Sequence, residues 1–346
     1  MTQATMSRVE AFLTEVDRYS AHNYHPLPVV LEGGEGSWVW DVDGNRYLDM
    51  LSAYSALNQG HRHPSIIGAA LSQMQKLTLT SRAFHNDQMG PFLNALCEVT
   101  GFEKALPMNT GAEAVETAIK MVRKWGYKIK GVPEDRAEII VCENNFHGRT
   151  TTIVGFSSED QYKDGFGPFT PGFVEIPYGN PEALEAAINQ NTVGFLVEPL
   201  QGEGGVVVPP PGFLSTAREL CTANRIAFMA DEIQTGLGRT GRMFCCDWES
   251  VRPDVQIVGK ALGGGVYPVS ATIADAEFMD VFDPGDHGST FGGNPLGAAV
   301  GLASLNVIVD EKLPERSDQL GSWFMDQLRE FESPHIKEVR GKGLMI

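Results

Sequence analysis

Two apolar runs, each closed by charged residues and followed by glycines, constrain the fold of this chain more than any other feature. Residues 226–230 (IAFMA) run into Asp231 and Glu232, and residues 255–258 (VQIV) run through one glycine into Lys260 and three further glycines. Runs of this kind are typical of strands that helices cover on both faces of a parallel sheet. If both strands belong to one such sheet, Asp231 and Lys260 emerge at its carboxyl edge, where open α/β sheets bind ligands. The pattern therefore predicts an α/β fold with a ligand site at that edge.

A carboxylate and an amine at one sheet edge suit a cofactor that carries a basic ring nitrogen and an aldehyde. Pyridoxal 5'-phosphate is such a cofactor, since it forms a Schiff base with a lysine and pairs its ring nitrogen with an acid. Taken alone, each motif is more often a solvated strand end, because charged residues are rarely buried without partners. The occurrence of both motifs, each after a buried-looking strand, favours the cofactor.

The wider sequence resembles the class III, fold type I, pyridoxal-phosphate-dependent aminotransferases, and within that family the ornithine aminotransferases. The stretches that carry the resemblance are HNYHPLPVVLEGGEGSWVWDVDG, NTGAEAVETAIKMVRKWGY, DGFGPFTPGF and VEPLQGEGGVVVPPPGF, and it extends over essentially all 346 residues. The resemblance implies an enzyme that transfers the δ-amino group of L-ornithine to 2-oxoglutarate by a ping-pong mechanism, giving glutamate 5-semialdehyde and glutamate. It also implies a homodimer with shared active sites.

The resemblance assigns roles to residues whose local motifs are ambiguous by themselves. It implies that Lys260 and Asp231 are catalytic, that the cofactor is bound by Gly111, Ala112, Phe146, Asp231, Gln234, Lys260 and Thr290, and that the substrate is bound by Tyr24, Tyr54, Arg149 and Glu203. His147 receives no role, because the family often has tryptophan at that position.

Several of these implied roles agree with the chemistry of the residue types. Gly111 and Ala112 follow a predicted strand and open a predicted helix, and the free N–H groups of a helix N-terminus bind anions such as phosphate. The planar guanidinium of Arg149 suits a carboxylate, and the ring of Phe146 suits stacking on a planar cofactor. Thr290 lies in a glycine-rich loop and, by resemblance, binds the cofactor phosphate of the neighbouring subunit.

Other enzyme classes use some of the same residue types. Glu198 and Glu203 flank a glycine turn, and paired carboxylates also serve glycoside hydrolases, but no cluster of carbohydrate-binding aromatic residues accompanies them. The resemblance instead implies that Glu203 is a gate residue that pairs with a C-terminal arginine. A lysine Schiff base also serves aldolases without a cofactor, although that alternative leaves Asp231 and Phe146 unexplained. Acetylornithine and 4-aminobutyrate aminotransferases share the aspartate and lysine, and they stay open, as does a non-catalytic homologue.

Strands alternate with helices from about residue 103, which predicts a mostly parallel central sheet with helices on both faces. The predicted strands are 105–108, 139–142, 173–176, 194–197, 226–230 and 255–258, and the predicted helices are 1–20, 66–79, 112–126, 182–189, 213–223, 295–310 and 315–331. Residues 21–50 predict antiparallel hairpins that turn at Gly33-Gly34 and at Asp43-Gly44.

We expect three parts: an N-terminal segment over residues 1–55, a large cofactor-binding domain over residues 56–310, and the start of a small C-terminal domain over residues 311–346. The sequence stops at VRGKGLMI, and its apolar end, residues 344–346, is expected to open a strand that has neither a continuation nor a partner. Because the family continues further, we expect the sequence to be a fragment of a full enzyme.

Charge, cysteine and histidine patterns restrict the partners and the compartment. The formal net charge of −17 argues against nucleic acid and anionic membranes, and no stretch approaches the length of a membrane span. The five cysteines show no C-x-x-C spacing, which favours a reducing compartment, so we expect a cytoplasmic protein. His61 and His63 have no acid or third histidine at ligand spacing, and no metal site is predicted.

Overall fold

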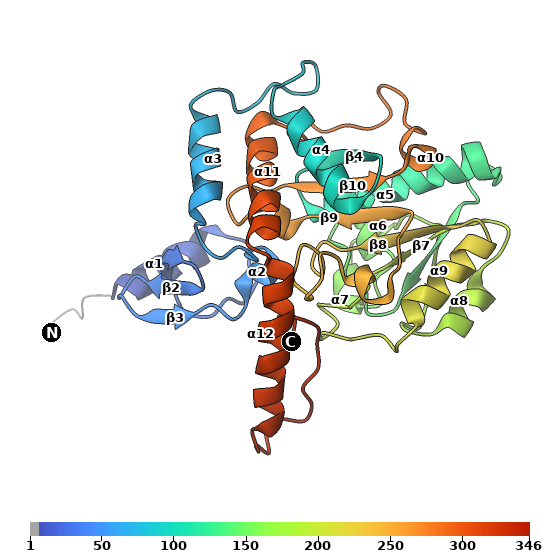
Figure 1. Cartoon of the computed structure of the whole chain (residues 1–346). Helices are drawn as coiled ribbons and strands as arrows, with labels where there is room; N and C mark the ends of the chain where they lie inside the picture. The colour runs from blue at the N-terminus through green and yellow to red at the C-terminus, as the bar shows by residue number, and fades with distance from the viewer. Residues whose placement is uncertain (1–6) are drawn as a thin grey trace.

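The centre of the molecule is a seven-stranded sheet, seen in the computed structural model, which describes residues 7–346 (Figure 1). Its strands lie in the order Lys104–Met108 (β4), Ser270–Ala274 (β10), Val255–Val258 (β9), Ala227–Asp231 (β8), Thr192–Val197 (β7), Glu138–Cys142 (β5) and Phe173–Ile176 (β6). The strands from β9 to β6 run parallel to their neighbours, whereas β10 is antiparallel to both β4 and β9. The predicted mostly parallel sheet is therefore confirmed.

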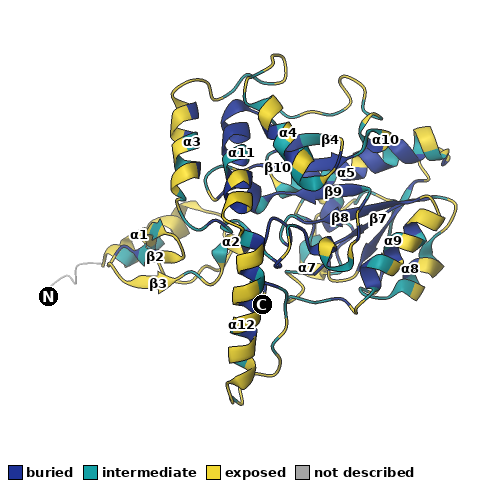
Figure 2. Cartoon of the chain, in the orientation of Figure 1, coloured by how far each residue is buried: buried dark blue, intermediate teal, exposed yellow. Residues whose placement is uncertain are grey.

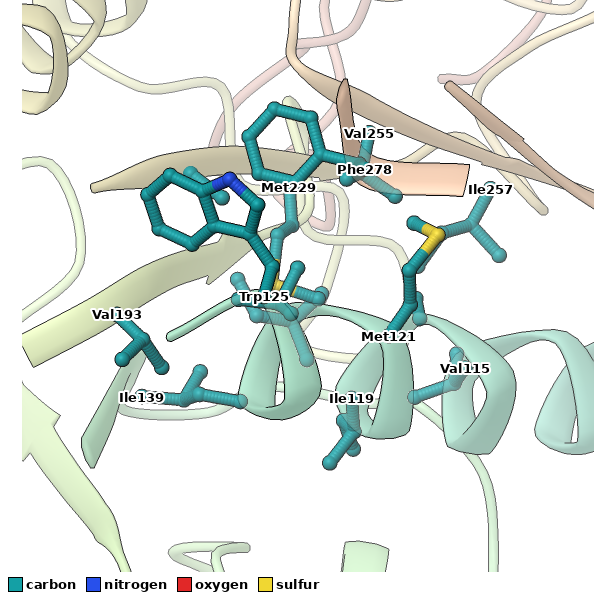
Figure 3. Packing of buried hydrophobic residues seen from close by; sticks show 14 of the residues in the cluster. Val115, Ile119, Met121, Trp125, Ile139, Val193, Met229, Val255, Ile257 and Phe278 are labelled. Carbon is teal, nitrogen blue, oxygen red and sulfur yellow. The ribbon is translucent and has the colours of Figure 1, made fainter. Parts of the chain in front are cut away.

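Helices cover both faces of this sheet because its central strands are apolar on both sides. Met229 of β8 packs toward α5 (Gly111–Trp125) on one face, among the side chains shown in Figure 3. Its neighbour Phe228 points to the other face, which α8 (Pro181–Ala187) and α9 (Phe213–Ala223) cover. Burial of each such side chain contributes on the order of 2 kcal/mol. The central strands are consequently buried along their whole length (Figure 2).

The other helices include α4 (Met89–Thr100) and α11 (Pro295–Asp310), which pack against β9 and β10. The remaining helices within residues 64–330 are α3 (Pro64–Met74), α6 (Thr151–Val154), α7 (Asp160–Lys163), α10 (Ala276–Met279) and α12 (Leu313–Glu330), with a π-helical turn over Gly126–Lys130 and 3-10 turns over Cys245–Glu249 and Lys260–Gly263. α11 packs against α3 and α4, and α12 extends away from the sheet (Figure 1). The helices predicted within residues 66–331 are confirmed to within a few residues, but neither α4 nor strand β10 was predicted.

The N-terminal segment forms one helix and a separate antiparallel sheet, whose elements are α1 (Arg8–Tyr19), β1 (Leu31–Glu35), β2 (Trp38–Asp41) and β3 (Arg46–Leu48). A capping box between Ser7 and Glu10 starts α1, and the part of the predicted helix before residue 7 lies outside the described residues. The two hairpins are confirmed, but the first turn was predicted at the wrong glycines. Gly33 and Gly34 lie inside β1, and the chain turns at Gly36, whose φ of 56° favours glycine.

Two histidines after these hairpins make hydrogen bonds to different parts of the chain. His61 hydrogen-bonds Asp49 at 2.8 Å, and His63 hydrogen-bonds Glu311 at 2.9 Å, so the two imidazoles face different acids. Between the hairpins and these histidines lies α2 (Ser52–Ser55), a short left-handed turn.

Among residues 7–346 there is no group of three potential metal ligands, nor a helix long and apolar enough to cross a membrane.

The last described residues do not form the unpaired strand that the sequence predicted. Leu344 donates its backbone N–H to the carbonyl of Arg239 at 3.0 Å, and Lys342 forms a local bridge with Met345. Met345 is buried against Leu200. The prediction was wrong because the backbone at Arg239, not a neighbouring strand, accepts a hydrogen bond from this apolar end.

Candidate active site

Asp231 and Lys260 lie at the carboxyl edge of the central sheet, as the sequence predicted. β8 and β9 are parallel neighbours, and Asp231, the last residue of β8, is in register with Ile257 of β9. Lys260 begins a 3-10 turn directly after β9, with a φ of 44°. A non-glycine residue in this left-handed region costs about 1 kcal/mol or more, and such strain is often found at functional sites. The turn directs Lys260 to the edge where β8 ends.

A cavity of about 170 Å³ brings together most of the residues that the resemblance assigned to the cofactor. It is lined by Gly111, Ala112, Phe146, His147, Gly148, Glu198, Asp231, Ile233, Gln234 and Lys260. Of the seven predicted cofactor residues, only Thr290 does not line it. These residues come from the ends of several strands and from the start of α5, so only the folded sheet assembles them.

The contact of His147 with Asp231 was not predicted from the sequence. Both side chains are buried, and His147 Nδ1 lies 2.7 Å from Asp231 Oδ2. Burial lowers the pKa of His147, but the hydrogen bond and charge of Asp231 outweigh it, and the net pKa lies above the ordinary value. Asp231 Oδ1 accepts the backbone N–H of Ile233 at 3.1 Å. The imidazole therefore fixes the orientation of the carboxylate from the side away from solvent.

Glu198, which also lines the cavity, is a second residue whose contribution the sequence did not reveal. Its Oε1 accepts the backbone N–H of Phe146 at 2.8 Å, and its Oε2 accepts that of Gly202 at 3.4 Å. Burial raises the pKa of Glu198 to about 7, helped by the charge of Asp231 and opposed by that of His147. One buried carboxyl thus holds both the segment that carries the aromatic ring and the turn that leads to Glu203.

The pKa of Lys260 is shifted by the same surroundings. Burial lowers the pKa of its ammonium group below the ordinary value, while the charges of Asp231, Glu203 and Glu198 act in the opposite direction. Because the burial effect is larger, the neutral amine is more accessible near neutral pH than in an exposed lysine. A neutral amine is the form that acts as a nucleophile and as a base.

The start of α5 presents an anion-binding edge to the cavity. Thr110 caps the helix by accepting the N–H of Glu113, and Glu113 in return accepts the N–H groups of Thr110 and Asn109. Gly111 and Ala112 belong to the first turn, where N–H groups have no acceptor within the helix. Both residues line the cavity. Their amides are therefore suited to a phosphate group.

Gln234 connects the cavity to the turn that carries Glu203. Its amide nitrogen lies 3.4 Å from Glu203 Oε1. A Cβ atom added at Gly202 would lie 1.7 Å from Gln234 Oε1, so no side chain fits between the turn and this amide. Gly202 is needed here because the backbone passes directly against Gln234.

The remaining predicted site residues lie outside this cavity. The guanidinium of Arg149 lies over the ring of Tyr162, 3.7 Å from its centroid, at the surface beside Phe146. Tyr24 is 80% exposed and Tyr54 is 52% exposed, both in the N-terminal segment. Thr290 is exposed in the loop before α11. The assignments of these residues stay predictions.

Replacing Glu198 with glutamine is expected to make stability less dependent on pH. Because the folded-state pKa is raised from 4.5 to about 7, the stability that the neutral carboxyl provides is fully present below about pH 4.5 and is lost as the pH rises through about 7. The loss amounts to about 3 kcal/mol. Glutamine stays neutral, so the melting temperature of Glu198→Gln relative to the wild type should be higher at pH 8 than at pH 5.

Thermal unfolding at both pH values measures this difference. The matched control is Glu219→Gln, since Glu219 is an exposed glutamate on α9. A Glu198→Gln difference that is the same at both pH values would contradict the buried, neutral carboxyl.

Comparisons with known proteins agree with the chemistry of this cavity. The family model described as aminotransferase class-III matches residues 19–346. An ornithine aminotransferase of Brevibacillus brevis is 60% identical over 341 residues, which are 99% of this chain and 86% of that protein. The crystal structure of the ornithine aminotransferase from Toxoplasma gondii has a TM-score of 0.96 and 48% identity, covering 98% of this chain and 81% of that chain.

A related enzyme that is named for a different substrate has the same fold. The acetylornithine aminotransferase from Elizabethkingia anophelis has a TM-score of 0.88 and 50% identity, covering 97% of this chain and 82% of that chain. The fold is thus shared by enzymes of this family that are named for different substrates. The family match over residues 19–346 and the identity to curated relatives give the conclusion that this chain belongs to the class III aminotransferases.

Proposed function

We propose that this protein is a pyridoxal-phosphate-dependent ornithine aminotransferase, which transfers the δ-amino group of L-ornithine to 2-oxoglutarate. The observation that carries this function is the cavity in which Lys260 and the buried Asp231 meet, in a chain 60% identical to an ornithine aminotransferase. The products are glutamate 5-semialdehyde and glutamate, formed in two half-reactions of a ping-pong sequence.

The residues of the cavity fit pyridoxal phosphate. The carboxylate of Asp231 accepts one hydrogen bond on each oxygen, from His147 and from the backbone of Ile233, and a carboxylate can accept about four. Asp231 therefore has capacity left for a ring N–H. Lys260 supplies the amine for the aldehyde, and the start of α5 supplies N–H groups for the phosphate.

The chain's own residues divide the chemistry among them. When bound, the cofactor supplies a carbonyl for the amino group and a ring that accepts electrons. Asp231, oriented by His147, keeps the ring nitrogen protonated through its negative charge. Lys260, whose pKa is lowered by burial, holds the cofactor and then moves a proton at the substrate carbon as a neutral amine. Phe146 offers its ring to one face of the site, and Gln234 offers its amide to the phenolic oxygen.

Substrate binding is proposed for four residues that lie outside the cavity. Glu203, exposed beside Gln234, acts as the gate residue, and Arg149 holds the far end of ornithine together with Tyr24. Tyr54 is proposed to contribute to the same substrate site. Release of Arg149 from the ring of Tyr162 would free its guanidinium for the carboxylate of the substrate.

We also propose a homodimer with shared active sites, in which Thr290 reaches the phosphate of the partner subunit. The exposure of Thr290 and its absence from the cavity of its own chain support this arrangement. Sedimentation at micromolar concentration tests it, and a monomer would contradict it.

A cytoplasmic location is proposed because the five cysteines are all unpaired.

The function is tested by the visible spectrum of the purified, cofactor-loaded protein before and after addition of an amine donor. Ornithine should change the visible band fastest, ahead of N-acetylornithine and 4-aminobutyrate, and 2-oxoglutarate should restore it. Preference for N-acetylornithine would favour the second candidate function, that of an acetylornithine aminotransferase. The similarity to the Elizabethkingia anophelis structure supports this candidate. No change with any donor would indicate a non-catalytic homologue.

A further inference from the structure

The turn that carries Glu203 is held from outside by an arginine that no role yet explains. Arg340, beyond the end of α12, donates from Nη2 to the carbonyl of Gly205 at 2.7 Å and from Nε to the carbonyl of Val206 at 3.1 Å. Its remaining nitrogen, Nη1, pairs with Glu338 at 2.6 Å. A planar guanidinium that spans two successive carbonyls fixes their orientation as well as their position.

The turn itself has backbone strain that external contacts must hold. It is closed by a two-way bridge between Gln201 and Val207, and the N–H groups of Gly205 and Val206 both point to the carbonyl of Gly202. Val206 has a φ of 55°, which is unfavourable for a β-branched residue. Such a conformation costs about 1–3 kcal/mol and persists only where its surroundings enforce it.

The segment that carries Arg340 is firmly docked on the large domain. Gly343 packs so closely on the backbone that an added Cβ would lie 2.4 Å from Gly241 N. Leu344 donates its N–H to the carbonyl of Arg239 and also to Ser317 Oγ, each at 3.0 Å. The segment therefore connects α12 and the large domain to the turn of Glu203.

The same segment reaches the turn at a second point. Met345 is only 7% exposed, and a Cβ atom added at Gly202 would lie 2.8 Å from its Cε and 1.7 Å from Gln234 Oε1. Gly202 is thus enclosed between Met345 and Gln234. Arg340 holds the far side of the turn, and Met345 holds the side that faces the cavity.

We propose that residues 340–345 form a brace that positions the Glu203 turn, with Arg340 as a positioning residue for substrate discrimination. The role in discrimination rests on the proposed function, in which Glu203 is the substrate gate. The mechanical role does not, because it follows from the contacts of Arg340 and Met345 alone. Ornithine carries an α-ammonium group that 4-aminobutyrate lacks, so the fixed charge of Glu203 acts differently on the two amine donors.

Hydrogen exchange of the holoenzyme, followed by mass spectrometry over residues 201–207, tests the brace directly. In Arg340→Gln, the amides of Gly205 and Val206 should exchange on the order of tenfold faster, since the charge-assisted hydrogen bonds from the guanidinium to the carbonyls of both residues are lost. Arg340→Lys should rescue part of the protection. The matched control is Arg329→Gln, because Arg329 is an exposed arginine on α12 that pairs with Asp326.

Steady-state kinetics of the same variants test discrimination. In Arg340→Gln, the ratio of kcat/KM for ornithine to kcat/KM for 4-aminobutyrate should fall several-fold, while Arg329→Gln keeps the wild-type ratio. Unchanged exchange in Arg340→Gln would overturn the brace, and faster exchange with an unchanged ratio would overturn its role in discrimination. A wild-type protein that is inactive on every donor would refute the proposed function, but the exchange rates would still decide the brace.

Discussion

Lys260→Ala is expected to abolish turnover and to remove the visible absorbance of the bound cofactor. Lys260 is the amine that lines the cavity, and burial lowers its pKa, so both the covalent attachment and the proton transfer depend on it. Loss of a residue with both functions should lower kcat by at least about 10⁴-fold. Absorbance spectra and single-turnover kinetics with ornithine measure the two effects separately.

The control for this variant is a lysine in the turn that follows α5, the helix whose opposite end lines the cavity. Lys128 is exposed in the turn that follows the helix, and Lys128→Ala should retain the spectrum and the activity of the wild type. A visible band that persists unchanged in Lys260→Ala would exclude Lys260 as the attachment point.

Asp231→Ala is expected to retain bound cofactor but to lose most of its turnover. The cofactor would still be attached at Lys260 and held at the start of α5, whereas the charge that keeps the ring nitrogen protonated would be missing. Removal of one such preorganised electrostatic group costs about 10²–10³ in kcat. Asp231→Asn should show a similar loss, because it keeps the size of the side chain but not its charge. Steady-state kinetics with cofactor in excess give both values.

Two comparisons decide whether the charge is responsible. Asp310→Ala, at an exposed position at the end of α11, should leave kcat unchanged. Near-normal kcat in Asp231→Asn would remove the electrostatic role from Asp231 and leave only its contact with His147.

The strands and helices that could be predicted from the sequence are those with strong apolar patterns. β8 and β9 appear as continuous apolar runs, and the structure shows them as parallel neighbours with Asp231 at the end of one and Lys260 just after the other. β10 was missed because its sequence, SATIA, is rich in small and hydroxylated residues. Ser270 and Thr272 donate their hydroxyls to backbone carbonyls at the start of α5 instead of packing as apolar side chains.

The residues of the candidate site were predictable where a motif had a local signal or where the family resemblance assigned a role. Asp231 ends one apolar strand and Lys260 follows another, and the occurrence of both motifs indicated this pair, whereas the role of Gly111 at the start of a helix came from the family resemblance. The partners of Asp231 and Phe146 had no such signal: His147 and Asp231 are 84 residues apart, and Glu198 meets Phe146 across 52 residues. Contacts at these separations depend on the order of strands in the sheet, which a single sequence does not reveal.

The two adjacent acids at the end of β8 have unequal consequences for the evolution of this site. Glu232 is fully buried on the other side of the strand end, where its carboxyl accepts the N–H groups of Cys245 and Cys246 and the hydroxyl of Thr235. Successive side chains of an extended chain point in opposite directions. Glu232 therefore cannot replace Asp231 in its present position. A lineage that lost Asp231 would have to break the hydrogen bonds of Glu232 and reorient its side chain before Glu232 could take over the role of Asp231.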